Sequence, residues 1–395
     1  MDIQLAQRTA AVKPSLTLAV TAKARELKAA GRDVIGLGAG EPDFDTPDHI
    51  KAAAIQAIHD GFTKYTAVDG IPGLKQSICD KFRRDNKLEY QPNQILVSCG
   101  GKQSFYNLAQ ALLNPGDEVI IPAPYWVSYP DMVRLASAEP VIIGAGIQQN
   151  FKITGEQLKN AISARTKLFV INSPSNPTGA VYNQEELQAL AQVLLEHPHV
   201  MIATDDMYEH IRWSRDPYLN LLSIAPELYS RTMVLNGVSK AYSMTGWRIG
   251  YAAGPETVIK AMKTIQSQST SNPTSISQVA AQAALDGDQT FIRRMRTEFE
   301  ERHNFIVNAL NEIDGVHCLP SDGAFYAFPH MQGVIDRLDG INDDLQLAEY
   351  LLDQCGIALV PGTAFGAPGY LRLSFAIDLK TLKDAAKRLH EGLSN

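Results

Sequence analysis

The sequence predicts an α/β protein whose main sheet is largely parallel. Seven short runs rich in Val, Ile and Leu follow one another between residues 95 and 252, with turns rich in Gly, Pro and Asn among them. Amphipathic patterns typical of helices lie between several runs, for example at residues 185–196. Because parallel strands are joined by crossovers that usually contain a helix, this alternation favours a parallel sheet covered by helices. The runs are residues 95–97, 119–121, 141–143, 168–171, 200–203, 233–235 and 249–252.

Two elements are predicted before this region. A helix over residues 16–30 should begin after Ser15, a residue that favours helix N-termini, and end at Gly31. A short apolar run at residues 34–37 then leads into a loop at 40–47 that is rich in Gly, Pro and Asp.

The pattern changes after the seventh run. Long helical patterns fill residues 256–310, and the remaining chain mixes strands with helices. We therefore predict a large α/β domain at residues 48–290 and a smaller α+β domain that combines residues 1–47 with 291–395. The C-terminal elements are strands at 323–328, 357–360 and 371–375 and a helix from Leu379.

Composition and charge exclude several classes of protein. Apolar residues make up 45% of the 395 residues and charged residues 20%, as in ordinary globular proteins. The formal net charge of −7 argues against a broad phosphate-binding surface, so no nucleic-acid partner is expected. No apolar stretch approaches the roughly 18 residues that cross a bilayer, and the N-terminus lacks the apolar core of a secretory signal. We expect a cytoplasmic protein without a membrane partner.

Metal ligands are not expected either. The four cysteines form no Cys-x-x-Cys pair, which argues against zinc sites and disulfide frameworks. The nine histidines offer no metal-binding constellation, and the spacing of His197 and His199 is that of histidines at a junction of helix and strand, which are usually solvated.

The segment at residues 236–250 is the most informative. A strand ending near Leu235 leads into a turn of small residues that carries Lys240, and Arg248 follows eight residues later. Ligands of open α/β sheets bind at the carboxyl ends of the strands. There, a lysine can form a Schiff base with an aldehyde, and an arginine can hold a phosphate. An aldehyde that carries a phosphate is pyridoxal 5'-phosphate, but a lysine and an arginine on a loop are more often plain surface charges, so this spacing decides for the cofactor only together with further motifs.

A second candidate anion site follows the first run. Gly101 and Lys102 open a predicted helix, whose backbone N–H groups suit the phosphate of the cofactor. The segment is not a nucleotide-binding P-loop, because Leu96 stands where the first glycine of that motif belongs and Gln103 where its hydroxyl belongs.

Spaced motifs along almost the whole chain resemble one family. The chain is similar to class I, fold type I, aminotransferases, and within them to the bacterial aspartate aminotransferases of subgroup Iγ. The resemblance implies a large domain with a mostly parallel seven-stranded sheet, a smaller α+β domain and a homodimer with shared active sites. The motifs, in family order, are residues 40–47, 64–65 with 70–73, 124–129, 173–179, 205–208, 237–250 and 372–375.

The resemblance assigns roles around the cofactor ring. Lys240 would be the catalytic lysine that holds pyridoxal phosphate. Asp205 would keep the pyridine nitrogen protonated so that the ring accepts electrons, and it is preferred to Asp206 because it matches the family position. Tyr208 and Asn176 would donate hydrogen bonds to the phenolic oxygen.

Other roles concern the phosphate and the ring face. Arg248, with Gly101 and Lys102 at the helix start, would hold the phosphate, and Trp126 would stack on the pyridine. Tyr65 would reach the phosphate of the partner subunit's cofactor, which is what implies the homodimer.

The resemblance also implies how a dicarboxylate substrate would be held. Arg372 would bind the α-carboxylate in a bidentate pair, and the backbone of Gly40 would approach the substrate. Residues 267–274 contain no arginine for a distal carboxylate, and Lys102 with Thr17 is implicated instead. The residues expected to contact substrate are Gly40, Trp126, Asn176, Arg372, Lys102 and Thr17.

The predicted reaction is transamination between L-aspartate and 2-oxoglutarate by a ping-pong mechanism. The alternatives on the same scaffold are a prephenate or aromatic amino-acid aminotransferase and a β-lyase. Lys13 and Lys102 would supply positive charge for a dicarboxylate larger than aspartate. A regulator that binds an effector without turnover is the alternative from another class, and the intact Lys240 argues against it.

Overall fold

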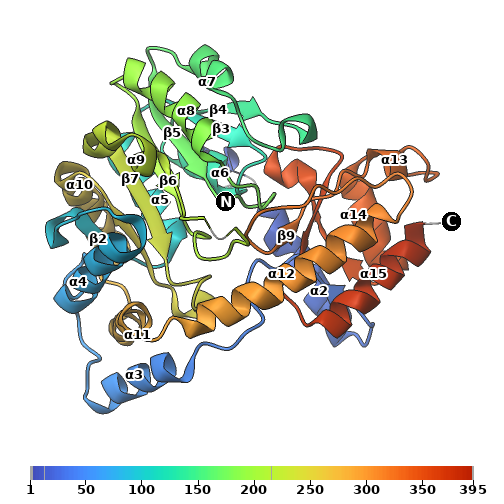
Figure 1. Ribbon diagram of the computed structural model, residues 1–395, viewed down its shortest axis with the longest axis horizontal. Helices are drawn as coiled ribbons and strands as arrows, with labels where there is room; N and C mark the ends of the chain where they lie inside the picture. Colours follow the sequence, from blue (N-terminus) through green and yellow to red (C-terminus); the bar gives the residue numbers. More distant parts are fainter. Residues whose placement is uncertain (1–2, 13, 215, 394–395) are drawn as a thin grey trace.

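The computed structural model describes residues 3–12, 14–214 and 216–393 and is built around a seven-stranded sheet (Figure 1). The strand order is β2-β8-β7-β6-β5-β3-β4. All neighbouring pairs from β7 to β4 are parallel, as predicted, whereas β8 runs antiparallel to both β7 and β2. The strands are β2 (Ile95–Ser98), β3 (Glu118–Ala123), β4 (Glu139–Gly144), β5 (Thr166–Asn172), β6 (Met201–Asp205), β7 (Thr232–Gly237) and β8 (Gly250–Ala253).

Helices cover both faces of the sheet, which explains why the middles of its strands are runs of apolar residues. In β2, Ile95 and Val97 enter one core and Leu96 enters the core on the opposite face. The first core packs against α3 (Asp48–His59), α4 (Pro72–Lys81), α7 (Gly155–Ala161), α8 (Gln184–Glu196), α9 (Leu221–Ile224) and α11 (Ser275–Asp286). The second packs against α5 (Gly101–Leu112), α6 (Ser128–Leu135) and α10 (Glu256–Ser267).

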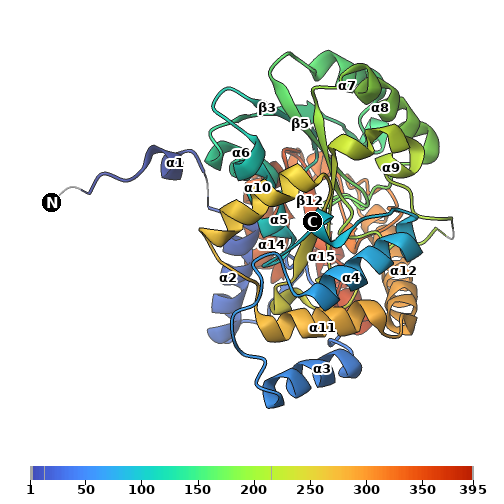
Figure 2. The same ribbon diagram turned by 90° about the vertical axis from the view of Figure 1, so that its left-hand side faces the viewer.

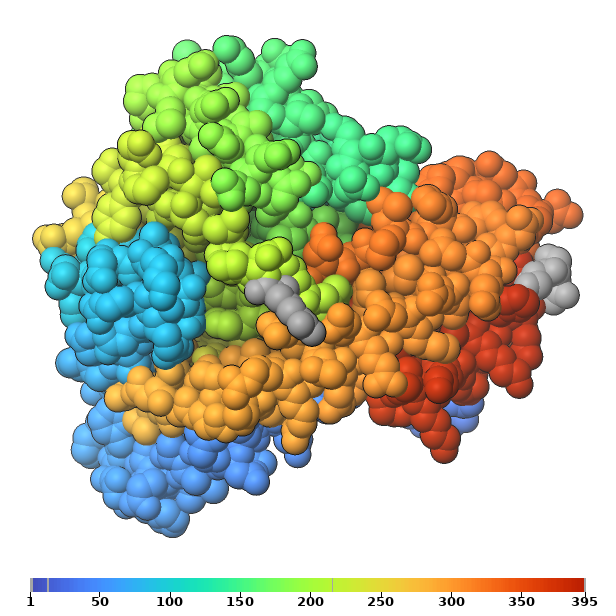
Figure 3. Space-filling model, in the orientation of Figure 1, coloured from blue at the N-terminus to red at the C-terminus, as the bar shows by residue number. Residues whose placement is uncertain are grey.

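A third core lies beside this layer and combines both ends of the chain. Strand β1 (Ile35–Gly36) pairs in parallel with β10 (Ile357–Ala358), and α2 (Leu16–Ala29) packs against β1 and β10. Figure 3 shows N-terminal atoms (blue) next to the C-terminal ones (red). The other elements here are α12 (Thr290–Asn311), β9 (Tyr326–Ala327), α13 (Gln332–Ile335), α14 (Asp344–Gln354), β11 (Val360–Pro361), β12 (Leu371–Ser374) and α15 (Leu379–Leu393).

Helix α2 begins and ends for the predicted reasons. The side chain of Ser15 accepts a hydrogen bond from the N–H of Leu18, and Gly31 adopts φ of +85° just beyond the last turn. The strands predicted at 323–328 and 357–360 are shorter than expected. The first is confined to β9. The second is divided at Leu359 into β10, which pairs with β1, and β11, which pairs with β12 in another sheet.

The N-terminal segment projects from the molecule (Figure 2), and α1 (Gln7–Ala10) within it contacts only the surface helix α6 among the helices and strands of the described chain that it meets most closely. None of the residues in α1 is buried, and Ile3 and Leu5 are largely exposed. Within the described parts of the chain, no helix combines the length and the apolar character that a membrane span requires.

Candidate active site

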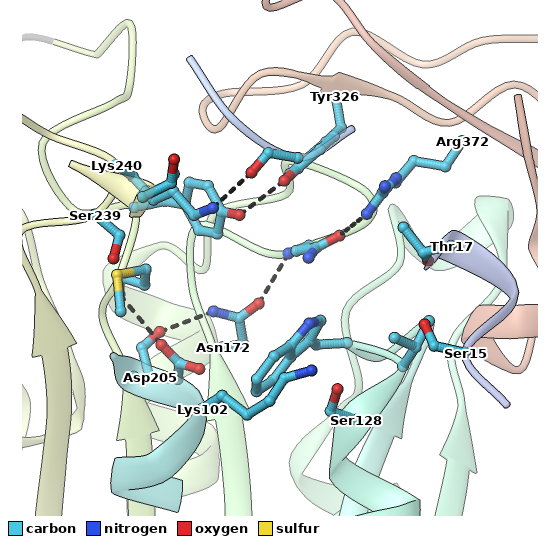
Figure 4. Close-up of a pocket in the computed structure, with 18 of the residues that line it drawn as sticks. Ser15, Thr17, Lys102, Ser128, Asn172, Asp205, Ser239, Lys240, Tyr326 and Arg372 are labelled. Atoms are coloured by element: carbon cyan, nitrogen blue, oxygen red, sulfur yellow. Dashed lines mark hydrogen bonds between the residues drawn. The ribbon is translucent and has the colours of Figure 1, made fainter. Parts of the chain in front are cut away.

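A cavity of about 370 Å³ opens at the carboxyl ends of β5 and β6 and beside the turn that follows β7. Figure 4 shows Lys240 and Asp205 on one side of it and Thr17 and Ser15 on the other. The structure brings together all but one of the predicted site residues. Those that line the cavity are Thr17, Gly40, Gly101, Lys102, Trp126, Asn176, Asp205, Tyr208, Lys240, Arg248 and Arg372.

Lys240 lies in the turn after β7, with its amine enclosed by protein. Its Nζ donates a hydrogen bond to the backbone oxygen of Gly40 at 2.5 Å. Burial lowers the pKa of the Lys240 amine to about 8, an effect that Glu41 partly opposes and Arg372 reinforces. Above pH 8 this amine is therefore mostly neutral and able to act as a nucleophile or a base.

Asp205 is the last residue of β6 and lines the cavity. Its Oδ2 accepts a hydrogen bond from the hydroxyl of Tyr129, and its Oδ1 accepts one from the N–H of Met207. Burial raises the pKa of Asp205, while these two hydrogen bonds favour the carboxylate. The amide of Asn172 donates to the backbone oxygen of Asp205 at 2.9 Å and fixes the end of the strand.

Asp206 turns away from the cavity and is fully buried. Its carboxyl accepts hydrogen bonds from Thr204 Oγ1 and from Asn220 Nδ2, at 2.5 and 2.7 Å. Burial, and then the negative charge of Glu209, raise the pKa of Asp206 to about 7. The two adjacent carboxyls therefore have different surroundings, and only Asp205 can meet a bound molecule.

Arg372, on β12, is the main cation of the opposite wall and is 2% exposed. It donates to the side-chain oxygen of Asn176 at 2.9 Å and to the backbone oxygen of Gly38 at 2.6 Å. Its guanidinium lies over the ring of Tyr326, whose hydroxyl is 2.8 Å from that of Tyr208. Arg372 Nε has no hydrogen-bond partner in the described chain, so donor capacity remains for an anion.

The start of α5 forms a corner of the cavity suited to an anion. Gly101 and Lys102 are its first two residues, whose N–H groups have no partner within a helix. Arg248 lies against this corner and donates to the backbone oxygens of Thr245 and Cys99. Gly100 has φ of +86°, and a Cβ on it would stand 2.3 Å from Arg248 Nη2, so a glycine is required.

Lys102 and Trp126 form the outer wall. The Lys102 Nζ lies 5.4 Å from the centre of the Trp126 ring, within the range of a cation–π contact. Protein atoms around its ammonium lower the pKa of Lys102 by desolvation, and the charge of Arg248 adds to this. Thr17 Oγ1 is buried and has no partner in the described residues. Lys13, which the sequence also suggested, lies outside the described residues.

Tyr65 is the predicted residue that the structure keeps apart from the others, because it is 92% exposed and does not line the cavity. His197 and His199 bind backbone oxygens of Val193 and Ser163. No group of three metal-ligating side chains comes together in the described part of the chain.

Three residues that sequence reasoning missed complete the site: Tyr129, Asn172 and Tyr326. Tyr129 lies in the motif at residues 124–129, but its role as a donor to Asp205 depends on the tertiary packing of α6 against β3 and β4. Asn172, the last residue of β5, could have been found from its place at a strand end. Tyr326 had no local signal, because it meets Tyr208 across 118 positions of sequence.

Fold and cavity together define an enzyme of α/β type whose site combines a lysine amine, a buried carboxyl and cations for anionic ligands. The family described as aminotransferase class I and II matches residues 32–389. The chain belongs to this family and is an aminotransferase.

Individual relatives agree with this assignment. The aspartate/prephenate aminotransferase of Nitrosomonas europaea is 59% identical over 99% of this chain and 100% of its own length. The crystal structure of the aspartate aminotransferase from Rhizobium meliloti has a TM-score of 0.95 and 46% identity, covering 99% of both chains. The structure of the aspartate aminotransferase from Thermus thermophilus with maleate has a TM-score of 0.94 and 42% identity, covering 99% of this chain and 100% of that one.

Proposed function

We propose that the protein is a pyridoxal phosphate-dependent aminotransferase that acts on L-aspartate and 2-oxoglutarate. The observation that carries the proposal is the cavity in which Lys240 and Asp205 face the cations Arg372 and Lys102. Relatives with 42 to 59% identity are named as aspartate or aspartate/prephenate aminotransferases, which supports this substrate class.

The residues present fit pyridoxal phosphate. Lys240 offers a partly neutral amine for the aldehyde, and Asp205 offers a carboxylate for the pyridine nitrogen. The start of α5 with Arg248 offers donors for the phosphate, and Trp126 offers an aromatic face. When bound, the cofactor would supply an electron sink for the carbanion left when Cα of the amino acid loses its proton.

The protein side chains would then perform the remaining work. Arg372 holds the α-carboxylate through its bidentate fork, for which its unpartnered Nε is available. Lys240 Nζ, as a neutral amine, is the base that takes the proton from Cα of the amino acid. As an ammonium group, it is then the acid that returns a proton. Asp205 keeps a proton on the ring nitrogen, and Tyr129 holds its carboxylate in place.

The distal carboxylate of aspartate is assigned to Lys102, with Thr17 Oγ1 as a hydrogen-bond donor. The Thermus thermophilus relative was solved with maleate, a four-carbon dicarboxylate like aspartate, which supports a dicarboxylate site. A lysine is a flexible point charge and selects carboxylate geometry less strictly than an arginine does.

Prephenate transamination is the second candidate function, because the relative that is 59% identical is named for both substrates. Lys102 lies at the rim of the cavity, where a larger dicarboxylate still meets its charge. A β-lyase reaction would use the same lysine and needs a leaving group at Cβ of the substrate.

We further propose a cytoplasmic homodimer of subgroup Iγ, with domains at residues 48–290 and at 1–47 with 291–395. The exposed Tyr65, together with the exposed apolar side chains of Ile55, Ile58 and Phe62 nearby in sequence, supports a second copy on this side. The projecting N-terminal segment offers Ile3 and Leu5 to the same kind of contact.

A panel of substrates tests the proposed function. Purified holoenzyme is assayed with aspartate, glutamate, alanine and phenylalanine as donors to 2-oxoglutarate, and with glutamate as donor to prephenate. We expect the highest kcat/KM with aspartate, and a change in cofactor absorbance when aspartate is added. If phenylalanine exceeds aspartate, the dicarboxylate assignment is wrong, and if no donor reacts, so is the proposed function.

A further inference from the structure

A group of buried polar side chains lies next to the turns that carry residues of the cavity. It consists of Lys81, Asn86, Glu209 and Asn236, which are 0%, 7%, 4% and 2% exposed. We call this group the Glu209 cluster. None of its members lines the cavity, and the proposed reaction does not use them directly.

The cluster centres on the carboxylate of Glu209. Its Oε1 accepts hydrogen bonds from Lys81 Nζ and from Asn236 Nδ2, the latter at 2.7 Å, and its Oε2 accepts one from Asn86 Nδ2 at 2.7 Å. Lys81 Nζ also donates to Asn86 Oδ1 at 2.7 Å. Burial acts to raise the pKa of Glu209, but the charges of Lys81 and His210 and these hydrogen bonds outweigh it and lower the pKa, so Glu209 is ionised.

An unusual helical turn builds this arrangement. Residues Phe82–Asn86 form a π-helix directly after α4, and Lys87 ends it with φ of 59°. In a π-helix, residues five apart lie on the same side, and Lys81 and Asn86 are five apart. Both side chains therefore face Glu209, which an α-helical continuation of α4 would not achieve.

The cluster contacts both chain segments that carry the candidate catalytic groups. Asn236 is the last but one residue of β7, and its Oδ1 also accepts from the N–H of Gly237, which leads into the turn with Lys240. Glu209 directly follows Tyr208, and its N–H donates to the backbone oxygen of Asp206. One carboxylate thus joins the turn after β6 to the end of β7.

We propose that Glu209 and Asn236 are positioning residues for the aminotransferase reaction, setting the end of β7 so that Lys240 Nζ meets both the cofactor and the substrate Cα. This inference rests on the proposed function. An enclosed ion pair is costly to desolvate, and well-packed apolar residues often stabilise a fold equally well. What apolar residues cannot supply here is an acceptor for the amide of Asn236.

The first test compares Asn236→Ala with Asn311→Ala in the holoenzyme. Asn311 is the matched control, because its amide also bridges two segments, binding the backbone of Val307 and Cys318, but lies away from the cavity. We expect Asn236→Ala to lower kcat by about 10- to 100-fold, since misplacing a reacting group by an ångström has effects of this size. KM for aspartate should stay within about threefold, because Arg372 and Lys102 are unchanged.

Asn311→Ala should keep kcat within about twofold of the wild type, even if its melting temperature falls as much as that of Asn236→Ala. If Asn236→Ala retains kcat within that same range, or if both variants lose activity alike, the positioning role is refuted. Should Asn236→Ala not fold, Asn236→Ser, whose side chain is too short to reach Glu209 Oε1 as the amide does, replaces it in the same comparison.

A rescue separates hydrogen bonding from charge. Lys81→Met leaves the charge of Glu209 buried without its cation, whereas Lys81→Met/Glu209→Gln removes both charges and still offers Asn236 an oxygen. We expect the double variant to recover kcat at least about tenfold relative to Lys81→Met. A folded double variant that is no more active than the single one contradicts the proposal.

A readout without turnover separates this inference from the proposed function. The pKa of the Lys240 amine is titrated in full-length protein free of cofactor, from the pH dependence of its acylation by a small reagent. The wild type should titrate near pH 8, and Asn236→Ala at higher pH, because a displaced Lys240 amine is less enclosed by protein. An unchanged pKa overturns the positioning role. Absence of transamination in the wild type overturns only the proposed function.

Discussion

Asp205 and Asp206 are neighbours in the chain but have opposite surroundings. Asp205 faces the cavity and binds Tyr129, while Asp206 points into the core and binds Thr204 and Asn220. A strand end explains the difference, because successive side chains along a strand point to opposite faces. The choice between the two could be made from the family motif, whereas Tyr129 as the donor could not, because this contact depends on tertiary packing.

Replacing each aspartate by alanine separates these roles. Asp205→Ala should lower kcat roughly 100-fold or more, because nothing then holds a proton on the cofactor ring. Asp206→Ala should mainly lower the melting temperature, since it leaves Thr204 and Asn220 without their buried partner. Steady-state kinetics and thermal unfolding of both variants check this, and a larger kcat loss in folded Asp206→Ala would reverse the assignment.

Lys102 should matter only for substrates with a second carboxylate. Lys102→Ala is expected to lower kcat/KM for aspartate and glutamate far more than for phenylalanine, because an apolar side chain gains nothing from the charge. An exposed ion pair accounts for about 1 kcal/mol, and one enclosed on substrate binding for roughly 2–5 kcal/mol. The measurement is the donor panel on both proteins. Equal losses for all donors would mean that Lys102 serves the cofactor phosphate instead.

At the scale of elements, the α5 corner depends on a single glycine. The sequence predicts a glycine-rich helix start as an anion site, and the structure adds the reason, because Gly100 leaves space for Arg248. The antiparallel direction of β8 is harder to predict from the sequence. The short turn-rich connection at 238–249 shows no helix long enough for a crossover, but an apolar run carries no information about its direction.

Gly100→Ala tests this corner against a matched control. The added Cβ would stand 2.3 Å from Arg248 Nη2, so Arg248 must move, and we expect cofactor affinity to fall at least about tenfold. Gly61 has a similar φ, +73°, with nothing within 4 Å of a Cβ. Gly61→Ala should carry positive-φ backbone strain of about 1 kcal/mol and retain the cofactor. Gly100 also has ψ of 161°, a conformation almost confined to glycine, so the melting temperatures of both variants are measured alongside. Cofactor binding is followed by absorbance during equilibrium dialysis. Equal cofactor affinities in the two variants would contradict the proposal that Arg248 binds the phosphate.

At the scale of the whole molecule, Tyr65 is the residue that a single chain leaves unexplained. Its ring is almost fully exposed, although it lies in a segment that matches a family landmark. Secondary-structure patterns in a sequence do not report contacts between chains. The role proposed for Tyr65 therefore follows only from the family resemblance. The sequence predicts that the N-terminal segment packs with the C-terminal part. It does not predict that β1 pairs with β10, nor the register of that pair.

Mixing two inactive variants tests whether active sites are shared. Lys240→Ala and Tyr65→Ala subunits are unfolded together, refolded and assayed. In a homodimer with shared sites, each hybrid contains one site with both defects and one with none, so about a quarter of wild-type activity should return. Refolded single variants are the controls. No recovery, in a protein that sediments as a monomer, would contradict the dimer.

We propose that Lys240 is the catalytic lysine of this aminotransferase. The most direct measurement is the single-turnover reaction of holoenzyme with aspartate, followed by cofactor absorbance, in wild type and Lys240→Ala. The wild type should convert its cofactor to the amino form within the time of one turnover and release a 2-oxo acid. Lys240→Ala, with folding and cofactor content unchanged, should lose at least several orders of magnitude in rate, because the proton at Cα has no acceptor. A near-normal rate in that variant would remove Lys240 from the reaction.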